Sequence, residues 1–498
     1  GKRMFVPDNP DDGSFEELYA RYGENLRPSR IMNGLTGYSA LTAVLFEVPA
    51  DYDASSLPLD GGNTLLVLDQ TTGQRLDVFA QLTKVSRDQD PHADTFVIQA
   101  YPRGRWPFGH TLVAVLTREL TRAGGQAIAT PAGVQTALQQ TSGPYADVRH
   151  FIEAQGIAAA DIISFTDFQV RDQASVAEPM QVMLDKVAAD DHPVKILSVT
   201  YHLSGRAVVK GLVRLSDFRR EDGRIEYHEN SQSRPLWTDF SLELPEQAQH
   251  GAVPVLIWGH GLASQKATFD FSDNSIENQL GFANINIDFP YHGSRILTEG
   301  YLPLMFTPDD VLGVTGAVGQ SVFDLFSLTH AIQRHLSDLD VMPRPPQNFF
   351  ERWYEQRFGA PAGRGVPDLD VSRIGYVGGS MGSLFGQSFA ALSPDVDGNY
   401  LAQCGGNIGF TLSNTSLLQH LDLDGFLGRD GFVPPELSGP DAAVIFNVAA
   451  HRVDYADGLN YAHYFRNPPP HTGLDPRPLV VSYGEGDRVV PNLGTYSL

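Results

Sequence analysis

The stretch IGYVGGSMGSLFG (374–386) decides how the second half of the chain is interpreted. Its first residues are apolar, as in a buried strand, and the residues after Ser380 are small and apolar at helical spacing. A sharp strand-to-helix turn would crowd side chains two positions before and after the serine, and glycine stands at both, Gly378 and Gly382. The pattern predicts a strained turn that lifts the Ser380 hydroxyl clear, near the positive end of a helix. A purely structural glycine-rich turn is the alternative.

From residue 253 onward, largely apolar runs alternate with helix-like segments, the clearest helix lying at 321–336. Such alternation predicts a mostly parallel sheet with helices on both faces. In sheets of this kind, functional residues gather at the carboxyl ends of the strands. The five predicted strands are 253–261, 281–293, 371–380, 400–410 and 478–487.

The front half of the chain is β-rich, and we expect a sandwich-like domain over 1–245, built as one module or two. A linker at 245–252 would separate it from a catalytic domain at 253–498. The predicted strands of the front domain are 41–48, 63–69, 75–82, 95–101, 111–120, 161–170, 194–217 and 235–244. Helices are predicted at 144–155 and 174–188.

The charge and composition of the chain exclude several classes of partner and site. The 498 residues carry a net charge of −23, which disfavours nucleic acid and anionic membrane surfaces as partners. The single cysteine, Cys404, excludes internal disulfides and zinc sites built on several thiolates. No run of apolar residues is long enough for a spanning helix. We expect a secreted or cell-surface protein whose signal peptide is not in this sequence, with a cytoplasmic protein as the alternative.

Two further signals lie at the ends of predicted strands. His260-Gly261-Leu262 closes the strand at 253–261, where acyl-transfer enzymes place a backbone N–H that binds the oxyanion. The second N–H would come from Met381, and His260 and Gly261 would support the turn. Asp487 follows the last predicted strand, where a carboxylate can orient a histidine. The alternatives are a plain turn with a buried histidine and a solvated aspartate.

The motifs GHGL, DFPYHG, GGSMG and GEGDRVVP occur in the same order along the chain as the corresponding motifs of the α/β-hydrolase superfamily. Over 253–498 the chain resembles that superfamily. More loosely, the whole chain resembles two-domain bacterial extracellular lipases of the virulence-factor type. The resemblance implies an α/β-hydrolase fold and hydrolysis of carboxylic esters by Ser380, Asp487 and a histidine, without metal or organic cofactor. A peptidase, a thioesterase, a polyester depolymerase or an inactive surface-binding module are the alternatives.

The triad histidine is not identified in 1–498, because all fifteen histidines precede Asp487, whereas the family order is serine, acid, histidine. We expect a separate C-terminal fragment, carrying a last strand, a helix and the histidine, to complete the site. The alternatives are a substitute histidine (His451, His463 or His471) or lost catalysis. Asp454 and Asp457 are the alternative acids.

Several weaker signals have structural explanations that we prefer. His292 follows a different strand from the one that precedes the triad histidine, Cys404 is expected to be an inert core thiol, and 393–399 is expected to be a solvated loop. The segment 421–431 lacks the spacing of a calcium loop. Two inserts, 299–319 and 411–445, are candidate lids over an acyl pocket, or ordinary loops. The aspartates of the calcium-like segment are Asp422, Asp424 and Asp430.

Overall fold

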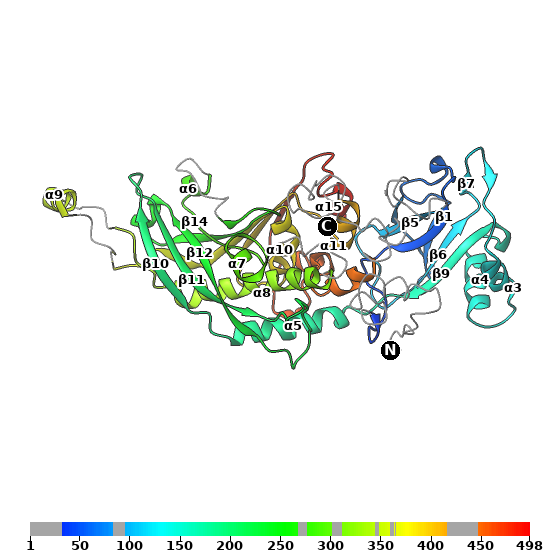
Figure 1. Cartoon of the computed structure of the whole chain (residues 1–498), viewed down its shortest axis with the longest axis horizontal. Helices are drawn as coiled ribbons and strands as arrows, with labels where there is room; N and C mark the ends of the chain where they lie inside the picture. The colour runs from blue at the N-terminus through cyan, green and yellow to red at the C-terminus, as the bar shows by residue number, and fades with distance from the viewer. Residues whose placement is uncertain are drawn as a thin grey trace.

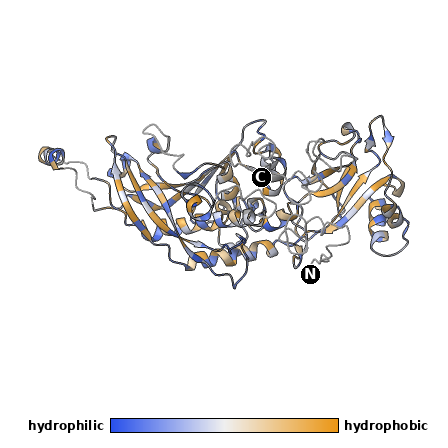
Figure 2. Ribbon diagram, viewed as in Figure 1, coloured by the Kyte–Doolittle hydropathy of each residue, from blue (hydrophilic) through white to orange (hydrophobic). Residues whose placement is uncertain are grey.

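The computed structural model describes residues 32–82, 95–266, 276–300, 311–343, 348–358, 363, 365–415 and 447–498. The molecule is elongated, with two small β-sheets at one end and a large sheet with its helices occupying the rest (Figure 1). Hydrophobic residues are concentrated along the strands of both parts (Figure 2). Among the described residues, no helix combines the length and apolar character needed to cross a membrane.

Two antiparallel sheets form the front part. Their strand orders are β1-β5-β4 and β3-β2-β6-β9. Residues from both sheets, including Phe46, Leu65, Ile98 and Leu112, share one buried core. The predicted sandwich-like domain over 1–245 is supported only in part, because the strands predicted at 194–217 and 235–244 belong to the large sheet. The strands are β1 (Val44–Pro49), β2 (Leu65–Asp69), β3 (Arg75–Leu76), β4 (Val78–Leu82), β5 (Thr95–Pro102), β6 (Thr111–Thr117) and β9 (Ile162–Gln169), with a separate ribbon of β7 (Thr121–Arg122) and β8 (Gln126–Ala127).

Helices cover the outer face of the four-stranded sheet. The helices α3 (Ala132–Gln139) and α4 (Pro144–Ala154) follow one another along the chain, and Val148 and Ile152 of α4 pack against Val113 and Val115 of β6. The predicted helix at 144–155 is therefore present, and it closes a second, smaller core on the sheet.

The large sheet has eight strands in the order β10-β11-β12-β14-β13-β15-β16-β17. The last five strands of this order are parallel, and β10, β11 and β12 are joined antiparallel. The carboxyl ends of the parallel strands therefore lie on one rim. The strands are β10 (Val194–Tyr201), β11 (Ala207–Asp217), β12 (Arg234–Leu244), β13 (Val253–Gly259), β14 (Ala283–Ile287), β15 (Leu369–Gly379), β16 (Gly398–Ala402) and β17 (Leu479–Ser482).

The large sheet extends across the predicted domain boundary. Strands β10 to β12 lie before residue 245, yet β12 pairs with β14, for example Leu242 with Ile285. The predicted linker contains only the short 3-10 helix η5 (Glu246–Gln249), which connects β12 to β13. The sheet is thus mixed rather than mostly parallel, because three strands predicted for the front domain complete it.

Three helices pack on one face of the large sheet: α5 (Ala174–Ala189), α8 (Val311–His335) and α10 (Met381–Leu392). Phe389 of α10 packs edge-on against Tyr376 of β15 and Phe326 of α8, with ring centroids 5.3 and 5.1 Å apart. On the opposite face, Leu256 and Trp258 of β13 are only half-buried, so the described residues cover the two faces unequally.

The remaining helices are short: α6 (Ile276–Leu280), α7 (Ile296–Glu299), α9 (Phe349–Phe358), α11 (Ile408–Asn414) and α15 (Asn492–Thr495). The 3-10 segments are η2 (Ala54–Ser56), η4 (Ala159–Asp161), η7 (Gly293–Arg295), η10 (Gly458–Asn460), η11 (Ala462–Phe465) and η12 (Pro470–Thr472). Most of these lie in the connections at the ends of the strands.

Buried polar contacts join the front part to the segment between β16 and β17. The Ser39 hydroxyl and the Arg171 guanidinium both contact Asp454. The amides of Asn407 and Asn447 donate to backbone carbonyls near β1. Since these groups are buried and satisfied across the contact, they fix how the two parts meet.

Candidate active site

Ser380 occupies the turn between β15 and α10. Its backbone has φ 54° and ψ −116°, a sparsely populated conformation for a residue with a side chain. The Ser380 N–H donates to the Ala402 carbonyl of β16 (2.9 Å), and the Ser380 carbonyl accepts from the N–H groups of Ser383 and Leu384. The surrounding backbone thus holds Ser380 in the strained conformation that the sequence predicts.

The glycines around Ser380 are required by close backbone contacts. A Cβ placed on Gly378 would stand 2.7 Å from the Gly382 carbonyl oxygen, and one placed on Gly382 would stand 2.2 Å from that of Gly259. Both distances are far below van der Waals contact. The start of α10 can therefore approach β13 and β15 only because these two positions have no side chain.

The turn after β13 lies beside the serine. Strand β13 pairs in parallel with β15, and Gly259 is opposite Gly378. A Cβ built on Gly261 would be 3.5 Å from the Ser380 Cβ and 3.9 Å from its Oγ. Gly261 thus lies against the nucleophile candidate, Leu262 follows it directly, and Met381 opens α10.

His260 supports this turn and is not available as a base. Its ring is buried, and Nε2 accepts a hydrogen bond from the Phe289 N–H at 2.9 Å. In the neutral ring the other nitrogen then carries the proton, so Nδ1–H donates to the Gly261 carbonyl at 2.9 Å. Burial lowers the His260 pKa to about 4, which keeps the ring neutral. Because the Gly261 carbonyl shares a planar peptide with the Leu262 N–H, His260 fixes the direction of that N–H.

A buried ion pair holds the far end of the same turn. The Lys266 ammonium lies 2.5 Å from Asp288 Oδ2, and the Lys266 backbone N–H donates to Asp288 Oδ1 at 2.7 Å. Burial opposes ionisation of Asp288, but these contacts with Lys266 hold its pKa below the usual value. The turn from His260 to Lys266 is therefore tied at both ends to residues that follow β14.

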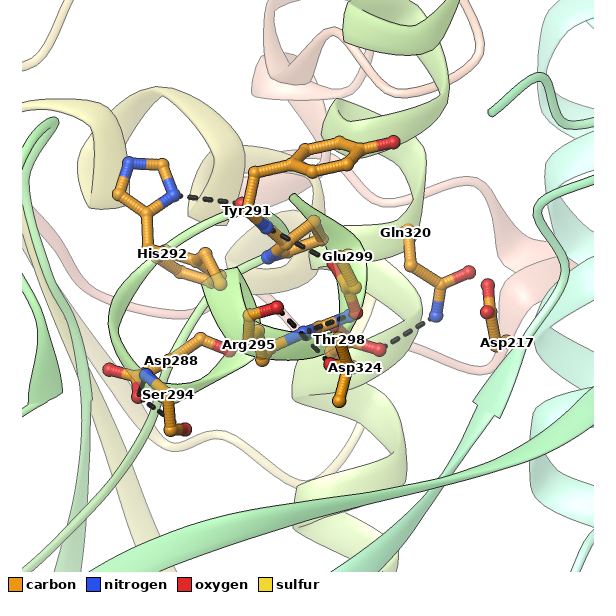
Figure 3. A network of polar contacts seen from close by, with 12 residues as sticks. Asp217, Asp288, Tyr291, His292, Ser294, Arg295, Thr298, Glu299, Gln320 and Asp324 are labelled. Carbon is orange, nitrogen blue, oxygen red and sulfur yellow. Dashed lines mark hydrogen bonds and ion pairs between the residues drawn. The ribbon is translucent and has the colours of Figure 1, made fainter. Parts of the chain in front are cut away.

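A buried ionic network beyond Asp288 was not predicted from the sequence. Figure 3 shows Arg295, in the loop after β14, contacting Glu299 and Asp324. Arg219 reaches the same Glu299 carboxylate at 2.9 Å. Burial opposes ionisation of Glu299, but the two guanidiniums lower its pKa to about 2. The spacing of Arg295 and Glu299 by four residues in a helix was the one visible signal.

His292 lies in the same loop, with a structural contact on one side. Its ring is buried, 5.1 Å from the His260 ring, and its Nδ1 contacts the Pro290 carbonyl at 2.8 Å. Figure 3 shows the ring directed away from the ionic network. The sequence predicts a structural role for His292, and no hydrogen bond joins it to Ser380 among the described residues.

Asp487 lies in the turn after β17, on the same rim as Ser380. Strand β17 pairs with β16, and β16 pairs with β15, so two strand spacings separate the two strand ends. The Asp487 Oδ1 accepts from the N–H groups of Val489 and Val490 at 2.8 and 3.0 Å. The carboxylate is half-buried, so part of it faces solvent.

No described histidine hydrogen-bonds to Ser380 or Asp487. The buried His451 contacts the Asn447 carbonyl at 3.0 Å, His463 lies between Arg105 and Gln173, and His471 is exposed in η12. His92 and His420 are outside the described ranges. None of the three substitutes named from the sequence is therefore joined to the serine or to the acid.

The two alternative acids are committed to other contacts. Asp454 pairs with Arg171, and Asp457 accepts from the N–H groups of Ile408 and Leu459. Both carboxylates are buried. Burial raises the Asp454 pKa to about 6 and the Asp457 pKa to about 7, so each acts as a structural group within the segment before β17.

The candidate lids are described only in part. Residues 311–319 form the first turns of α8, where a Cβ on Gly316 would stand 1.8 Å from the Gly223 carbonyl oxygen. This half of the first insert is thus a packed helix, and residues 301–310 lie outside the described ranges. So do 416–446, which contain most of the second insert and Asp422, Asp424 and Asp430.

The segment 393–399 and Cys404 both have structural roles. In 393–399, Asp397 accepts from the Ile374 N–H at 3.2 Å. Cys404 follows β16 rather than lying within it, and burial raises the pKa of its thiol, as in an unreactive core cysteine. The described residues contain no group of three or more His, Cys, Asp or Glu placed to hold a metal ion.

Comparisons with known proteins show only distant similarity. No family model and no curated protein matches the chain. The solved structures that the chain resembles at this distance include acetyl xylan esterase 1 from Thermoanaerobacterium sp. JW/SL YS485, with 15% identity, a TM-score of 0.40, and coverage of 64% of this chain and 81% of that one. An acetyl xylan esterase from Paenibacillus sp. R4 has 14% identity, a TM-score of 0.32 and coverage of 62% and 89%. An S-formylglutathione hydrolase from Agrobacterium tumefaciens has 14% identity, a TM-score of 0.25, and coverage of 61% of this chain and 95% of that one.

Proposed function

We propose that the protein is a serine hydrolase of the α/β-hydrolase type that cleaves carboxylic esters, with Ser380 as the nucleophile. The observation that carries the proposal is the backbone of Ser380, held at φ 54° between β15 and α10 with Gly261 against its side chain. Strain of this kind persists where the surrounding structure imposes it, and it is concentrated at functional sites.

In the proposed reaction, the Ser380 Oγ attacks the ester carbonyl carbon and its proton passes to a base. The carbonyl oxygen becomes negatively charged, and the N–H groups of Leu262 and Met381 would stabilise it. Collapse of this intermediate breaks the bond to the alcohol, which leaves with the proton from the base. Water then attacks the acyl-serine by the same steps and releases the acid.

We further propose that the base is a histidine oriented by Asp487 and located outside the described residues. The outer edge of β17 supports a separate C-terminal segment as its source, because β17 is the last strand of the sheet among the described residues and Val480 on it is 58% exposed. A strand added there would cover the edge and bring its own residues to the rim beside Asp487. His92 and His420, which also lie outside the described ranges, are the alternatives within this chain.

The same groups could act on peptides, thioesters or polyesters, since a fold does not fix a substrate. A lipase-type substrate and a secreted or cell-surface location stay predictions. An inactive binding module is the candidate from a different class, and the lack of a described histidine at Ser380 is the observation in its favour.

Covalent labelling tests the proposal directly. The full-length protein is treated with a fluorophosphonate probe, and the modified peptide is identified by mass spectrometry, with Ser380→Ala as the control. We expect the probe on Ser380 and no labelling of the variant. A wild-type protein that stays unlabelled, while hydrolysing no short-chain nitrophenyl ester, would favour the binding module.

A further inference from the structure

The helix α9 presents an aromatic face that is largely exposed in the described part of the chain. Its sequence, FFERWYEQRF, contains five aromatic residues. At about 100° per residue, all five fall within one half of the helix circumference. Their exposed fractions are high: Phe349 77%, Phe350 79%, Trp353 53%, Tyr354 55% and Phe358 65%.

The rings contact one another rather than a core. Tyr354 and Phe358 lie 4.8 Å apart between centroids, and Phe349 and Phe350 lie 6.0 Å apart. Figure 1 shows α9 clear of the large sheet, at one end of the molecule's long axis. An apolar face of this size, placed away from the body, indicates a binding surface.

Residues at both ends of α9 stabilise the helix. Asn348 caps it, because its side-chain oxygen accepts from the Glu351 N–H at 2.9 Å and its amide donates to the Glu351 carboxylate at 3.0 Å. Arg357 lies in the last turn, where a cation is favoured. A capped ten-residue helix is nevertheless marginal alone in water, so covering its aromatic face would stabilise it.

We propose that α9 docks the protein on a neutral lipid–water interface, with its aromatic face inserted among the headgroups. The face consists of Phe, Trp and Tyr without Leu, Ile or Val, and the same spacing places Arg357 among the rings. The rings of Trp353 and Tyr354 are amphipathic and favour the headgroup region, where the Arg357 guanidinium can also stay hydrated. The helix sequence contains two glutamates and two arginines, so it has no net charge to attract a charged partner. The chain's charge of −23 opposes anionic lipid.

A second copy of the chain fits this face less well. A ten-residue helix is about 15 Å long and about 10 Å wide. One half of it offers a few hundred square ångströms, whereas a stable interface needs about 800 Å² from each partner. Since α9 stands away from the body in Figure 1, neighbouring elements would add little area.

Docking through α9 would leave the proposed active site open. The helix precedes the amino end of β15, whereas Ser380 follows its carboxyl end. The helix would therefore act as an anchor rather than as a cover for the serine. The inference is independent of the proposed function, because it needs no catalysis.

Vesicle binding by the full-length protein tests the proposal. The protein is sedimented with phosphatidylcholine vesicles and with vesicles that also contain phosphatidylglycerol. We expect binding to the neutral vesicles, weaker binding to the anionic ones, and a loss of at least about tenfold for the triple variant Phe350→Ser, Trp353→Ser, Phe358→Ser. These side chains support no core, so the variant should fold normally. The double variant Leu203→Ser, Leu297→Ser, which alters exposed leucines elsewhere, should bind like the wild type.

Fluorescence identifies the element that inserts. Brominated phosphatidylcholine should quench part of the wild-type tryptophan emission, and Trp353→Phe should keep binding but lose that part. The proposal is overturned if the triple variant binds like the wild type, if the wild type does not bind neutral vesicles, or if it binds only anionic ones. A dimer in light scattering that the triple variant abolishes, without vesicle binding, would assign the face to a second copy.

Discussion

Gly261 lies directly against Ser380, with room for one further carbon atom between them. A Cβ on Gly261 would be 3.5 Å from the Ser380 Cβ and 3.9 Å from its Oγ, which is ordinary van der Waals contact. In the proposed mechanism, the carbonyl oxygen bound by the N–H groups of Leu262 and Met381 would lie on the side of the serine that Gly261 borders. The size of residue 261 therefore controls access to the proposed oxyanion site.

We expect Gly261→Ala to lower kcat/KM for a nitrophenyl ester by about tenfold to a hundredfold, because the added methyl group displaces the carbonyl oxygen from its donors. The free energy of unfolding should change little, since no atom is closer than 3.5 Å to the new carbon. Enzyme kinetics and thermal unfolding of the same preparations check both parts. Unchanged kinetics would place the oxyanion elsewhere.

Ser380→Gly and Ser380→Ala form a matched pair at the strained turn. Both remove the hydroxyl, so both should abolish ester hydrolysis and probe labelling. Glycine adopts positive φ without strain, whereas alanine keeps the strain of serine at φ 54°. We expect Ser380→Gly to unfold with a free energy about 1 kcal/mol higher than Ser380→Ala. Equal stabilities in denaturant titration would show that the turn stores no strain, and activity in either variant would exclude Ser380 as nucleophile.

Asp457 should make stability depend on pH. Burial raises its pKa in the folded state to about 7, above the ordinary 3.8. The folded state therefore holds this proton more tightly, so the stabilisation is present in full below about pH 4 and is lost as pH rises through 7. Asp457→Asn is neutral at every pH and keeps one of the two acceptors, that for Ile408 or that for Leu459, so its unfolding temperature should fall less than that of the wild type between pH 4 and pH 8. A difference that does not vary with pH would contradict the raised pKa.

Local patterns in the sequence predicted the strand-to-helix turn at Ser380, and the structure places Ser380, Gly261 and Asp487 on one rim. The turn and the three rim positions were predictable because each depends on a few adjacent residues and on the direction of a parallel strand. The pairing of β12 with β14 was not predictable in this way, because an alternating strand has the same pattern at the edge of a sandwich and in a mixed sheet. The contact of Arg219 with Glu299 joins residues that are distant in the chain, so no local pattern reveals it.

Asp487→Asn separates a catalytic carboxylate from one that only shapes a turn. The Asp487 Oδ1 accepts two backbone N–H groups, from Val489 and Val490, and an asparagine oxygen can accept the same two bonds. The turn should therefore persist and thermal unfolding should change little. If the carboxylate orients a histidine and stabilises its cation, turnover should fall by about 10⁴-fold, because the amide presents the wrong partner to the ring. Steady-state kinetics on a nitrophenyl ester measure this fall, with Asp397→Asn as a control, since that aspartate also accepts a backbone N–H but follows α10 rather than β17. A loss below about tenfold would show that Asp487 only stabilises the turn and that another group orients the base.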